Sequence, residues 1–416
     1  MTSGSRLPGI AEEASDRIVV HADMDCFYAS CERLREPALE DEPLVVGMGY
    51  EPGESVGAVA TASYEARAHG VESAQAISKA LDLLPRKREA TTDPDLDVDA
   101  AGFYRPVDMP FYESISEGVR AILHEHAETV REVSIDEAYL DVTDRTSWGE
   151  VEAFARELKE RIRNEVGVTA SIGVAPNMST AKIASDAEKP DGLVVVRPGA
   201  VEEFLAPVPV EELHGVGPVT ARELRSRGIE VSAELADADR RALIEAFGER
   251  GRELHRRARG EDDRPVTPKG RPKSLSRESA FADPTDAVAE VENRVRTLAE
   301  AVAGRARRKD ALYRTIGIKV VTPPFEVNTR ERSLPGPVEE PELVERVALD
   351  LLEEFDGERV RKVGVRVSNL EFASAQQARL DGWDDVDAED DHGTVDADSD
   401  DRGTYPRGQA SLTDFD

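Results

Sequence analysis

Apolar and polar positions follow two different periods along the first part of the chain. Short apolar runs bounded by turn residues predict strands, and apolar residues spaced three or four apart predict amphipathic helices. These patterns predict a strand running into a helix over 17–34, strands at 44–46, 57–62, 133–142 and 169–175, and helices at 64–70, 112–128 and 150–166. Their alternation predicts an α+β layered domain between residues 17 and 200.

The rest of the chain divides into segments of different composition. A small helical region is predicted over 198–262, followed at 263–273 by a connector that carries Pro, Lys and Arg. A second α+β unit is predicted over 274–372, with strands near 315–321 and 362–370 and a helix near 342–355. Within the first domain, residues 86–105 are rich in Asp, Pro and Arg, which predicts an acidic insertion at the surface.

The two ends of the chain lack the patterns of a folded domain. Residues 1–16 are polar and are expected to be flexible, and residues 373–416 are strongly acidic and are expected to be disordered. No apolar run is long enough to span a bilayer, and no export leader is evident. The two cysteines exclude a disulfide framework and fit a reducing compartment. We therefore expect a cytoplasmic monomer with no membrane partner.

The net charge of −32, from 85 acidic and 53 basic residues, would normally argue against a nucleic-acid partner. The acidic residues, however, occur along nearly the whole chain, and lysine is scarce relative to arginine. This composition is typical of proteins that stay soluble in concentrated salt, and it predicts a halophilic source. High salt weakens phosphate contacts. A DNA-binding protein from such a cell would depend on close, geometrically fixed contacts.

Three carboxylates stand at or near the ends of apolar runs. Asp136 and Glu137 are adjacent in one run, and Asp23 follows another. Ionised acids beside a core are costly unless a cation neutralises them, and oxygen ligands suit Mg²⁺ or, as an alternative, Mn²⁺. Two strands side by side would gather these carboxylates into a two-metal site for phosphoryl transfer, with the Met24 carbonyl as a neutral ligand. The structural alternative is that the acids cap strand ends or face solvent.

Several residues are candidates for binding a nucleoside triphosphate. Tyr64 and Arg67 lie three apart on one face of a predicted helix, and Lys189 precedes a Pro-Asp-Gly turn. Lys182 is a weaker candidate. Phe27 and Tyr28 follow the first acidic strand, where an aromatic ring can pack under a sugar and exclude a 2′-hydroxyl. Solvated charges and ordinary core aromatics are the alternatives.

A Gly-x-Gly turn between predicted helices, with Gly215 and Gly217, resembles a helix-hairpin-helix. Its main-chain N–H groups can bind a DNA phosphate without sequence preference, although a plain helical turn is an alternative. Basic residues of the connector and the second unit are further candidates for DNA backbone contacts. The candidates are Lys273, Arg277, Arg307, Arg308 and Lys309.

The C-terminal segment carries a separate short motif. Leu412 and Phe415 are three apart, with Gln409 three residues before Leu412. One helical turn would present both apolar side chains to a groove. The pattern resembles the peptide that binds the ring-shaped sliding clamp, although Asp416 stands where a second bulky residue is usual. The alternative is a tail with two chance apolar residues.

Together these motifs resemble those of the Y-family translesion DNA polymerases, in the DNA polymerase IV branch, of an archaeal and halophilic kind. The resemblance covers about 17–372 and rests on the segments 23–30, 64–67, 134–139, 171–175 and 189–192. It implies template-directed, low-fidelity DNA synthesis past damaged bases on primer-template DNA, from deoxynucleoside triphosphates. Asp23, Asp136 and Glu137 then resemble the metal ligands, and Tyr28 resembles the steric gate against ribonucleotides.

The same resemblance implies a right-handed polymerase with four parts. These are a palm over 17–34 and 109–197, fingers over 35–108, a helical thumb over 198–262 and, after a linker at 263–273, a little finger over 274–372. Two other functions stay open. A nucleotidyl cyclase also sets carboxylates on a palm-like sheet, and a DNA-binding clamp adaptor would keep the fold without activity.

Overall fold

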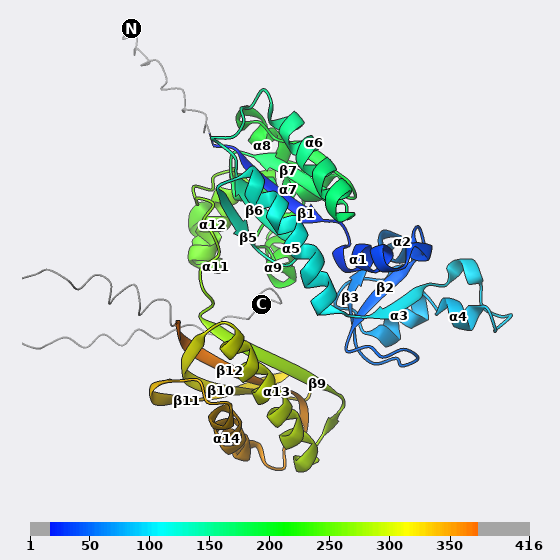
Figure 1. Ribbon diagram of the computed structural model, residues 1–416. Coiled ribbons are helices and arrows are strands. Elements are labelled where there is room, and N and C mark those ends of the chain that lie inside the picture. The colour runs from blue at the N-terminus through cyan, green and yellow to red at the C-terminus, as the bar shows by residue number, and fades with distance from the viewer. Residues whose placement is uncertain (1–16, 373–416) are drawn as a thin grey trace, which may run out of the picture. The chain divides into compact units, whose positions relative to one another are not determined.

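The computed structural model describes residues 17–372, which divide into two compact units at Lys269–Gly270 (Figure 1). Both units combine helices with β-sheet, as the sequence predicts. The predictions for residues 1–16 and 373–416 lie outside the described residues. None of the helices in the described part is both long and apolar enough to cross a membrane.

A five-stranded sheet, in the order β5-β6-β1-β7-β8, is the centre of the first unit. Its strands are β1 (Val19–Met24), β5 (Thr129–Glu132), β6 (Glu137–Asp141), β7 (Ala170–Ala175) and β8 (Leu193–Val195). The helices around it are α1 (Phe27–Arg35), α5 (Met109–His126), α6 (Val151–Arg161), which continues into a π-turn (Ile162–Val166), and α7 (Met178–Ala187). The central strand β1 pairs antiparallel with both β6 and β7, so chain segments far apart in sequence meet on it.

The alternation of side chains along β1 assigns its two faces. Val20 and Ala22 lie in the apolar core with residues of α5 and α6. Val19 lies in a second core with Ala181 and Ala184 of α7. His21 and Asp23 share the face of Val19, so both polar side chains lie on the side of the sheet that α7 covers.

The predicted strand over 133–142 is wrong at its beginning. Residues 133–136 form the loop of a hairpin between β5 and β6, and Asp136 lies in this loop, next to the first residue of β6. Ser134 causes the turn, because its Oγ accepts hydrogen bonds from the main-chain N–H groups of Asp136 and Glu137. A serine side chain that bonds its own backbone in this way competes with strand pairing.

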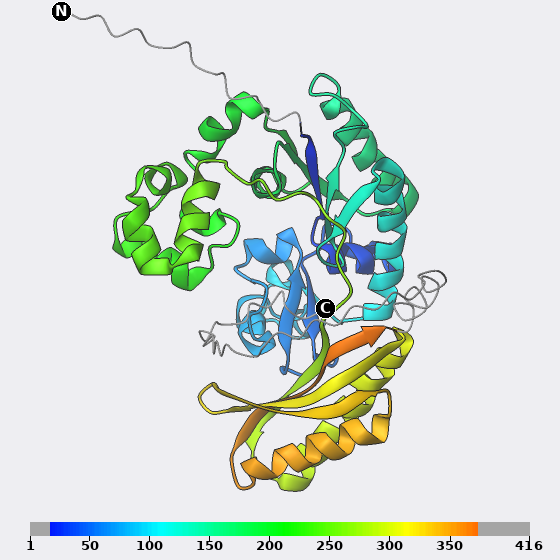
Figure 2. The same cartoon turned by 90° about the vertical axis from the view of Figure 1, so that its left-hand side faces the viewer.

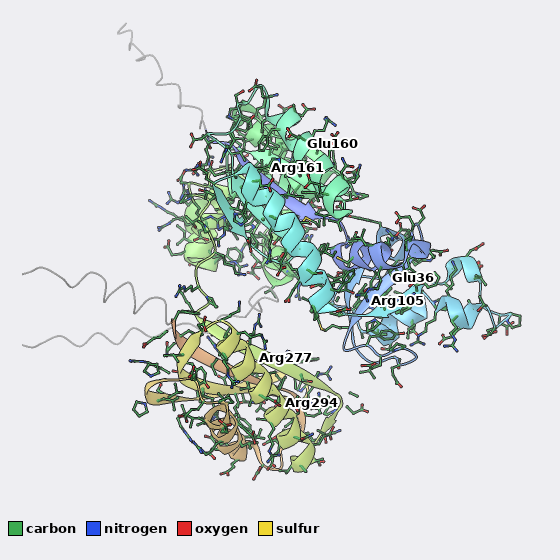
Figure 3. The ribbon with its side chains drawn as sticks, in the orientation of Figure 1. Glu36, Arg105, Glu160, Arg161, Arg277 and Arg294 are labelled. Carbon is green, nitrogen blue, oxygen red and sulfur yellow. The ribbon has the colours of Figure 1, made fainter. Side chains whose placement is uncertain are left out.

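A three-stranded sheet, in the order β3-β2-β4, forms a smaller layer of the first unit. Its strands are β2 (Leu44–Met48), β3 (Ala58–Ala62) and β4 (Phe103–Pro106), and its helices are α2 (Tyr64–Ala68), α3 (Ile77–Leu83) and α4 (Lys87–Ala90). The predicted surface insertion over 86–105 is therefore wrong at its end, where β4 pairs parallel with β2 and buries Tyr104. Arg105 of β4 also forms an ion pair with Glu36, at 2.5 Å (Figure 3).

The predicted helical region contains five short helices. They are α8 (Val201–Leu205), α9 (Pro218–Ser226), α10 (Ser232–Asp237), α11 (Arg240–Phe247) and α12 (Glu249–Ala258). Their apolar residues share one core with α7 of the sheet domain. This region is thus packed against the helix that covers the polar face of β1.

The second unit has a four-stranded sheet in the order β11-β10-β12-β9. Its strands are β9 (Ser274–Thr285), β10 (Ala311–Thr322), β11 (Glu326–Val338) and β12 (Val360–Phe372), and its helices are α13 (Val288–Arg308) and α14 (Pro341–Leu352). Both helices pack on the same face of the sheet (Figure 2), over the buried side chains of Val363, Val365 and Val367. The sequence prediction named β10, β12 and α14 but missed α13, β9 and β11.

Candidate active site

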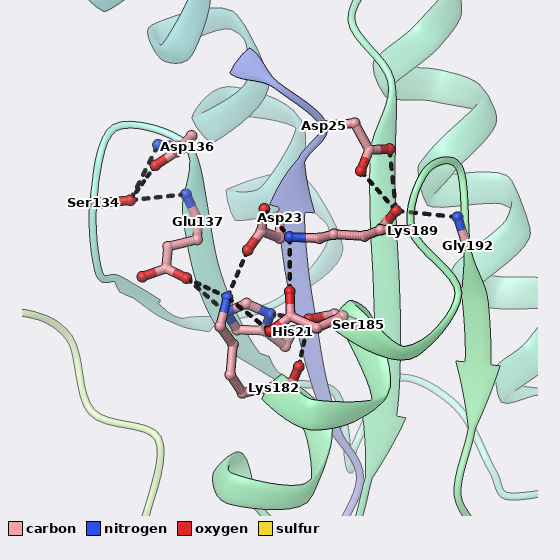
Figure 4. Close-up of polar contacts among 12 residues, drawn as sticks. His21, Asp23, Asp25, Ser134, Asp136, Glu137, Lys182, Ser185, Lys189 and Gly192 are labelled. Carbon is pink, nitrogen blue, oxygen red and sulfur yellow. Dashed lines mark hydrogen bonds and ion pairs between the residues drawn. The ribbon is translucent and has the colours of Figure 1, made fainter. Parts of the chain in front are cut away.

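Asp23 and Glu137 face each other across the β1–β6 ladder. They are direct partners in the antiparallel register, so their Cβ atoms lie on the same face of the sheet. The main-chain N–H of Met24 donates to the carbonyl of Asp136, at 2.9 Å, which fixes the end of β1 against the hairpin loop. The two acidic segments that the sequence predicts as neighbours are therefore neighbours in the structure (Figure 4).

Two lysines of the α7 segment neutralise these carboxylates. Lys182 Nζ lies 2.6 Å from Asp23 Oδ2 and 2.8 Å from Glu137 Oε2. Lys189 Nζ lies 2.7 Å from Asp23 Oδ1 and 2.8 Å from Asp186 Oδ1. Both oxygens of Asp23 thus contact an ammonium group (Figure 4).

The pKa values of the two acids follow from this arrangement. Burial alone would raise the pKa of Asp23, which is 8% exposed, but the charges of Lys182 and Lys189 outweigh burial and lower it. Burial likewise opposes ionisation of Glu137, but the charge of Lys182 outweighs burial and holds the pKa of Glu137 far below the usual range. Both groups are therefore carboxylates at neutral pH, the form that coordinates a metal ion.

α7 lies close enough to the sheet for these contacts because β7 has a glycine at the point of approach. A Cβ added to Gly173 would lie 2.1 Å from the main-chain oxygen of Ala181 and 2.3 Å from the nitrogen of Ser185. Any larger residue would push the helix away. The glycine thus sets the distance between Lys182 and the carboxylates on β1 and β6.

His21 lies fully buried beside the two carboxylates. Its Nδ1 is 2.8 Å from Ser185 Oγ, and that hydroxyl donates its proton to the carbonyl of Lys182, at 2.7 Å. Ser185 therefore accepts from His21 Nδ1–H, which leaves Nε2 to face Glu137 Oε2 at 3.4 Å. Burial lowers the pKa of His21 despite the nearby carboxylates.

The donor set at this point fits a divalent cation. His21, Asp23 and Glu137 each offer a ligand atom, and these atoms lie within 4.8 Å of one another. His21 Nε2 is buried and has no hydrogen-bond partner among the described residues. The two carboxylates suit Mg²⁺ or Mn²⁺, whereas the imidazole nitrogen is a ligand more typical of other first-row divalent ions.

Asp136 is near this group but not part of it. Its Oδ1 accepts a hydrogen bond from Ser134 Oγ at 2.5 Å, so its carboxylate is held by the hairpin loop (Figure 4). Burial raises the pKa of Asp136, and the charges of Asp23 and Glu137 raise it further. An added cation would relieve this repulsion.

The residues predicted to bind the triphosphate lie in two different places. Lys189 lies in the acidic site. Tyr64 donates its hydroxyl to Asp25 Oδ1, at 3.1 Å, and the Arg67 guanidinium lies 4.9 Å from the centre of the Tyr64 ring. Arg67 Nε also donates to the carbonyl of Ala62. Tyr64 and Arg67 therefore lie together beside a second carboxylate, that of Asp25.

Asp25 is the centre of a hydrogen-bonded cluster, and the sequence analysis did not identify it. Its carboxylate accepts from Ser171 Oγ at 2.9 and 3.0 Å, from the main-chain N–H of Asp191 at 2.8 Å, and from Tyr64. It is 4% exposed. Asp25 thus connects β7, the turn after Lys189 and the helix α2 that carries Tyr64 and Arg67.

The two aromatic candidates differ in exposure. Phe27 is 2% exposed and belongs to the main apolar core, which supports its alternative reading as a core aromatic. Tyr28 is partly exposed and stacks on the buried ring of Tyr112, with centroids 4.6 Å apart and an interplanar angle of 19°. The stacking holds the Tyr28 ring in one orientation at the start of α1.

The candidate DNA contacts lie in both units. Gly215 has a φ of +91°, and Gly217 is the N-cap of α9, so the Gly-x-Gly turn leads directly into a helix. Arg257 and Arg250 donate to the carbonyls of His214 and Gly215, which fixes the turn. In the second unit, the candidates lie at the start of β9 and at the end of α13. They are Lys273, Arg277, Arg307, Arg308 and Lys309.

Comparison with known proteins assigns the family. Residues 22–186 match the impB/mucB/samB family, residues 272–380 match the C-terminal domain of that family, and residues 198–229 match its helix-hairpin-helix motif. DNA polymerase IV of Halobacterium salinarum is 64% identical over 383 residues, which cover 92% of each chain. The chain belongs to the Y family of DNA polymerases. DNA polymerase IV of Methanoculleus marisnigri is 42% identical over 88% of this chain and 98% of its own.

Solved structures of Y-family polymerases confirm the predicted α+β polymerase fold. A Y-family DNA polymerase chimera has a TM-score of 0.74 and 29% identity, over 85% of this chain and 99% of that one. The insertion ternary complex of Dbh DNA polymerase has a TM-score of 0.60 and 28% identity over the same shares. The resemblance seen in the sequence is thus confirmed, and the findings support a translesion DNA polymerase rather than a cyclase or an inactive adaptor. The boundaries of palm, fingers, thumb and little finger stay predictions.

Polymerases of this family use divalent metal ions, and an acidic group that could hold such an ion lies on β1 and β6. Sequence reasoning missed His21 and Asp25 and gave Lys182 little weight. The period of two along β1 was a usable signal for His21, because it places His21 on the face of Asp23. Nothing local distinguished Lys182, since its role depends on how α7 packs against β1.

We predict that Asp25→Asn lowers the free energy of unfolding by about 2 kcal/mol, because three donors converge on a carboxylate and an amide nitrogen cannot accept from them. Urea denaturation measures this change. Asp144→Asn, at an exposed position, is the matched control and should change stability by less than about 0.5 kcal/mol. Equal stability of the two variants would contradict the role given to Asp25.

Proposed function

We propose that the group on β1 and β6 is the catalytic centre of this polymerase, with Asp23, Asp136 and Glu137 as ligands of two divalent ions. The ions are Mg²⁺, with Mn²⁺ as an alternative, and the main-chain carbonyl of Met24 is a further ligand. The observation that carries this proposal is the pairing of Asp23 with Glu137 in the strand register. The substrates are primer-template DNA and deoxynucleoside triphosphates.

When bound, the ions would activate the primer 3′-hydroxyl and neutralise the leaving pyrophosphate. The residues of the chain then have to hold the ions and substrates in position and balance their charge. The rigid ladder between β1 and β6 fixes two of the three carboxylates relative to each other, and the hairpin loop fixes the third. Such fixed geometry avoids the reorganisation that water would need at the moment of reaction.

Lys189, Tyr64 and Arg67 are the residues proposed to bind the triphosphate. Lys189 contacts Asp23 in the structure, so nucleotide binding would require its ammonium to move from carboxylate to phosphate. Tyr64 and Arg67 lie together on α2, where the guanidinium packs over the ring. A planar guanidinium and a phenol hydroxyl match phosphate oxygens in geometry and charge.

Tyr28 is the proposed steric gate, with Phe27 as the core residue behind it. The stack on Tyr112 leaves the Tyr28 ring little freedom to move aside. A ring held in this way would contact the sugar of an incoming nucleotide and leave no room for a 2′-hydroxyl. Selection of the sugar would then depend on shape rather than on a hydrogen bond.

DNA contacts are proposed for the Gly215–Gly217 turn and for the basic residues Lys273, Arg277, Arg307, Arg308 and Lys309. The turn precedes the N-terminus of α9, whose main-chain N–H groups suit a phosphate. The basic side chains would add backbone contacts, which weaken with salt. The chain is proposed to act as a monomer.

We predict that Glu137→Gln lowers the rate of primer extension by about a thousandfold, equivalent to about 4 kcal/mol, because a ligand charge is lost from the metal site. Primer extension on undamaged and damaged templates in molar salt with Mg²⁺ measures it, and circular dichroism checks the fold. Glu157→Gln, at an exposed position on α6, is the control and should extend primers at the normal rate. Normal extension by Glu137→Gln would refute the assignment.

For Tyr28→Ala we predict that the preference for deoxyribonucleotides over ribonucleotides falls at least about tenfold, since a methyl group leaves space for the 2′-hydroxyl. Competing insertion of dCTP and CTP opposite the same template base gives the ratio. Tyr28→Phe keeps the ring and should keep the selectivity. If alanine and phenylalanine variants discriminate equally well, Tyr28 is not the gate.

The predicted clamp-binding residues Gln409, Leu412 and Phe415 lie outside the described residues, and we propose that they bind a ring-shaped sliding clamp. Removal of residues 409–416 should abolish capture of the clamp by the polymerase but leave clamp-independent primer extension unchanged. Affinity measurements with the purified clamp of the source organism test this. Thr413→Ala is the control, and equal affinity with and without the segment would exclude the proposed contact.

A further inference from the structure

Lys182 occupies the place between two proposed metal ligands. Its ammonium group bridges Asp23 Oδ2 on β1 and Glu137 Oε2 on β6, at 2.6 and 2.8 Å (Figure 4). The side chain of Lys182 is only 25% exposed. The two carboxylates raise the pKa of Lys182 well above its usual value despite burial, so it carries a full charge.

An ammonium group and a divalent ion that share the same carboxylate oxygens lie close together, so each weakens the binding of the other. Lys182 takes one oxygen of each carboxylate, and two cations at contact distance repel each other strongly where little water screens them. Binding of a metal ion by Asp23 and Glu137 therefore favours movement of Lys182 out of the carboxylate pair. The backbone of Lys182 is held, because its carbonyl accepts from Ser185 and α7 lies against Gly173. The movement is thus one of the side chain alone.

A second acceptor for Lys182 is already in place. Asp186 lies one helical turn further along α7, and its Oδ2 is 3.5 Å from Lys182 Nζ. The other oxygen of Asp186 accepts from Lys189 at 2.8 Å. Asp186 is half exposed, so an ammonium group that turns toward it moves out of the carboxylate pair and toward solvent.

We propose that Lys182 is an exchangeable counter-ion of the active site, which holds Asp23 and Glu137 together before metal binds and transfers to Asp186 when a divalent ion takes its place. The inference rests on the proposed metal site. It gives Lys182 and Asp186 positioning roles, since neither needs to contact the reacting atoms.

The exchange also links metal binding to nucleotide binding. Lys189 contacts Asp23 through one oxygen and Asp186 through another. If Lys189 moves to a triphosphate, it releases an oxygen of Asp23 for the metal ion and an oxygen of Asp186 for Lys182. Nucleotide and metal ion would then each favour the binding of the other.

A purely structural role for Lys182 makes different predictions. A fixed ion pair would stabilise the fold but would oppose metal binding whatever residue stands at position 186. In the exchange, part of the effect of Asp186 on metal binding depends on Lys182, because Lys182 moves to it. The contact of Asp186 with Lys189 accounts for the rest. The two roles are therefore separated by the effect of Asp186 with and without Lys182, a double-mutant cycle.

The test is a titration of the full chain with Mn²⁺ alone, in molar salt and without DNA or nucleotide, followed by calorimetry. Lys182→Met should bind Mn²⁺ at least about tenfold more tightly than the unaltered chain, because no ammonium competes. Asp186→Asn should weaken binding about threefold, and its effect should be clearly smaller in the Lys182→Met background, where only the contact with Lys189 is lost. Lys79→Met, on the exposed face of α3, is the control for loss of a positive charge.

Thermal melting provides a second measurement on the same variants. With EDTA, Lys182→Met should melt below the unaltered chain, because two facing carboxylates have lost their shared cation, and Mn²⁺ should restore its melting temperature. Unchanged Mn²⁺ affinity in Lys182→Met would overturn the proposal. An equal effect of Asp186→Asn in both backgrounds would also overturn it, since Asp186 would then act by its charge alone.

The metal site itself is tested separately. Asp23→Asn and Glu137→Gln should each lose most of the Mn²⁺ affinity of the unaltered chain. If they bind Mn²⁺ normally, the proposed metal site is wrong. If they lose binding while Lys182→Met behaves like the unaltered chain, only the exchange is wrong.

Discussion

The cost of keeping ionised carboxylates out of water is the constraint on which the active site depends. Asp23 and Glu137 lie on adjacent strands, on the face that α7 covers, so neither can be solvated as a surface acid would be. Such groups either become protonated or are matched by cations. In this chain they are matched by Lys182 and Lys189, and the pKa values of both acids stay low. These two carboxylates are therefore charged and neutralised by lysines of the chain itself.

The positions of those lysines depend on how closely α7 and the sheet approach each other. Gly173 removes the side chain that would separate them, and Ser185 bonds both His21 of β1 and the carbonyl of Lys182. Asp25 also joins separate segments, because its carboxylate accepts from the turn after Lys189 and from Tyr64. Small or hydrogen-bonding residues at these contacts are thus as much a part of the site as the carboxylates.

The sequence was sufficient for the parts of the site that depend on strand pairing. Asp23 and the Asp136–Glu137 pair each follow or lie in an apolar run, and adjacency of the runs was the only assumption needed. It was not sufficient where a side chain changes the local backbone or where packing brings distant elements together. Ser134 turns the first residues of the predicted strand into a hairpin loop, and Lys182 reaches the carboxylates only because α7 packs against β1. α13 is a different case, because its helix was predictable from the sequence. Val291, Val295, Leu298 and Val302 have helical spacing.

Because the chain is strongly negative, short contacts matter more for binding nucleic acid and triphosphate than long-range electrostatic attraction does. A net charge of −32 offers no broad attraction for nucleic acid or triphosphate, and in concentrated salt the screening length falls to about 3 Å at 1 M. Exposed ion pairs lose most of their value under such conditions, whereas pairs at contact distance inside a largely dry site do not. A lysine that is already ordered by a carboxylate loses less freedom when it turns to a phosphate or to a neighbouring acid. Lys182 and Lys189 meet this requirement because Asp23, Glu137 and Asp186 hold them within reach of one another. The acids proposed to bind metal thus also position two cations.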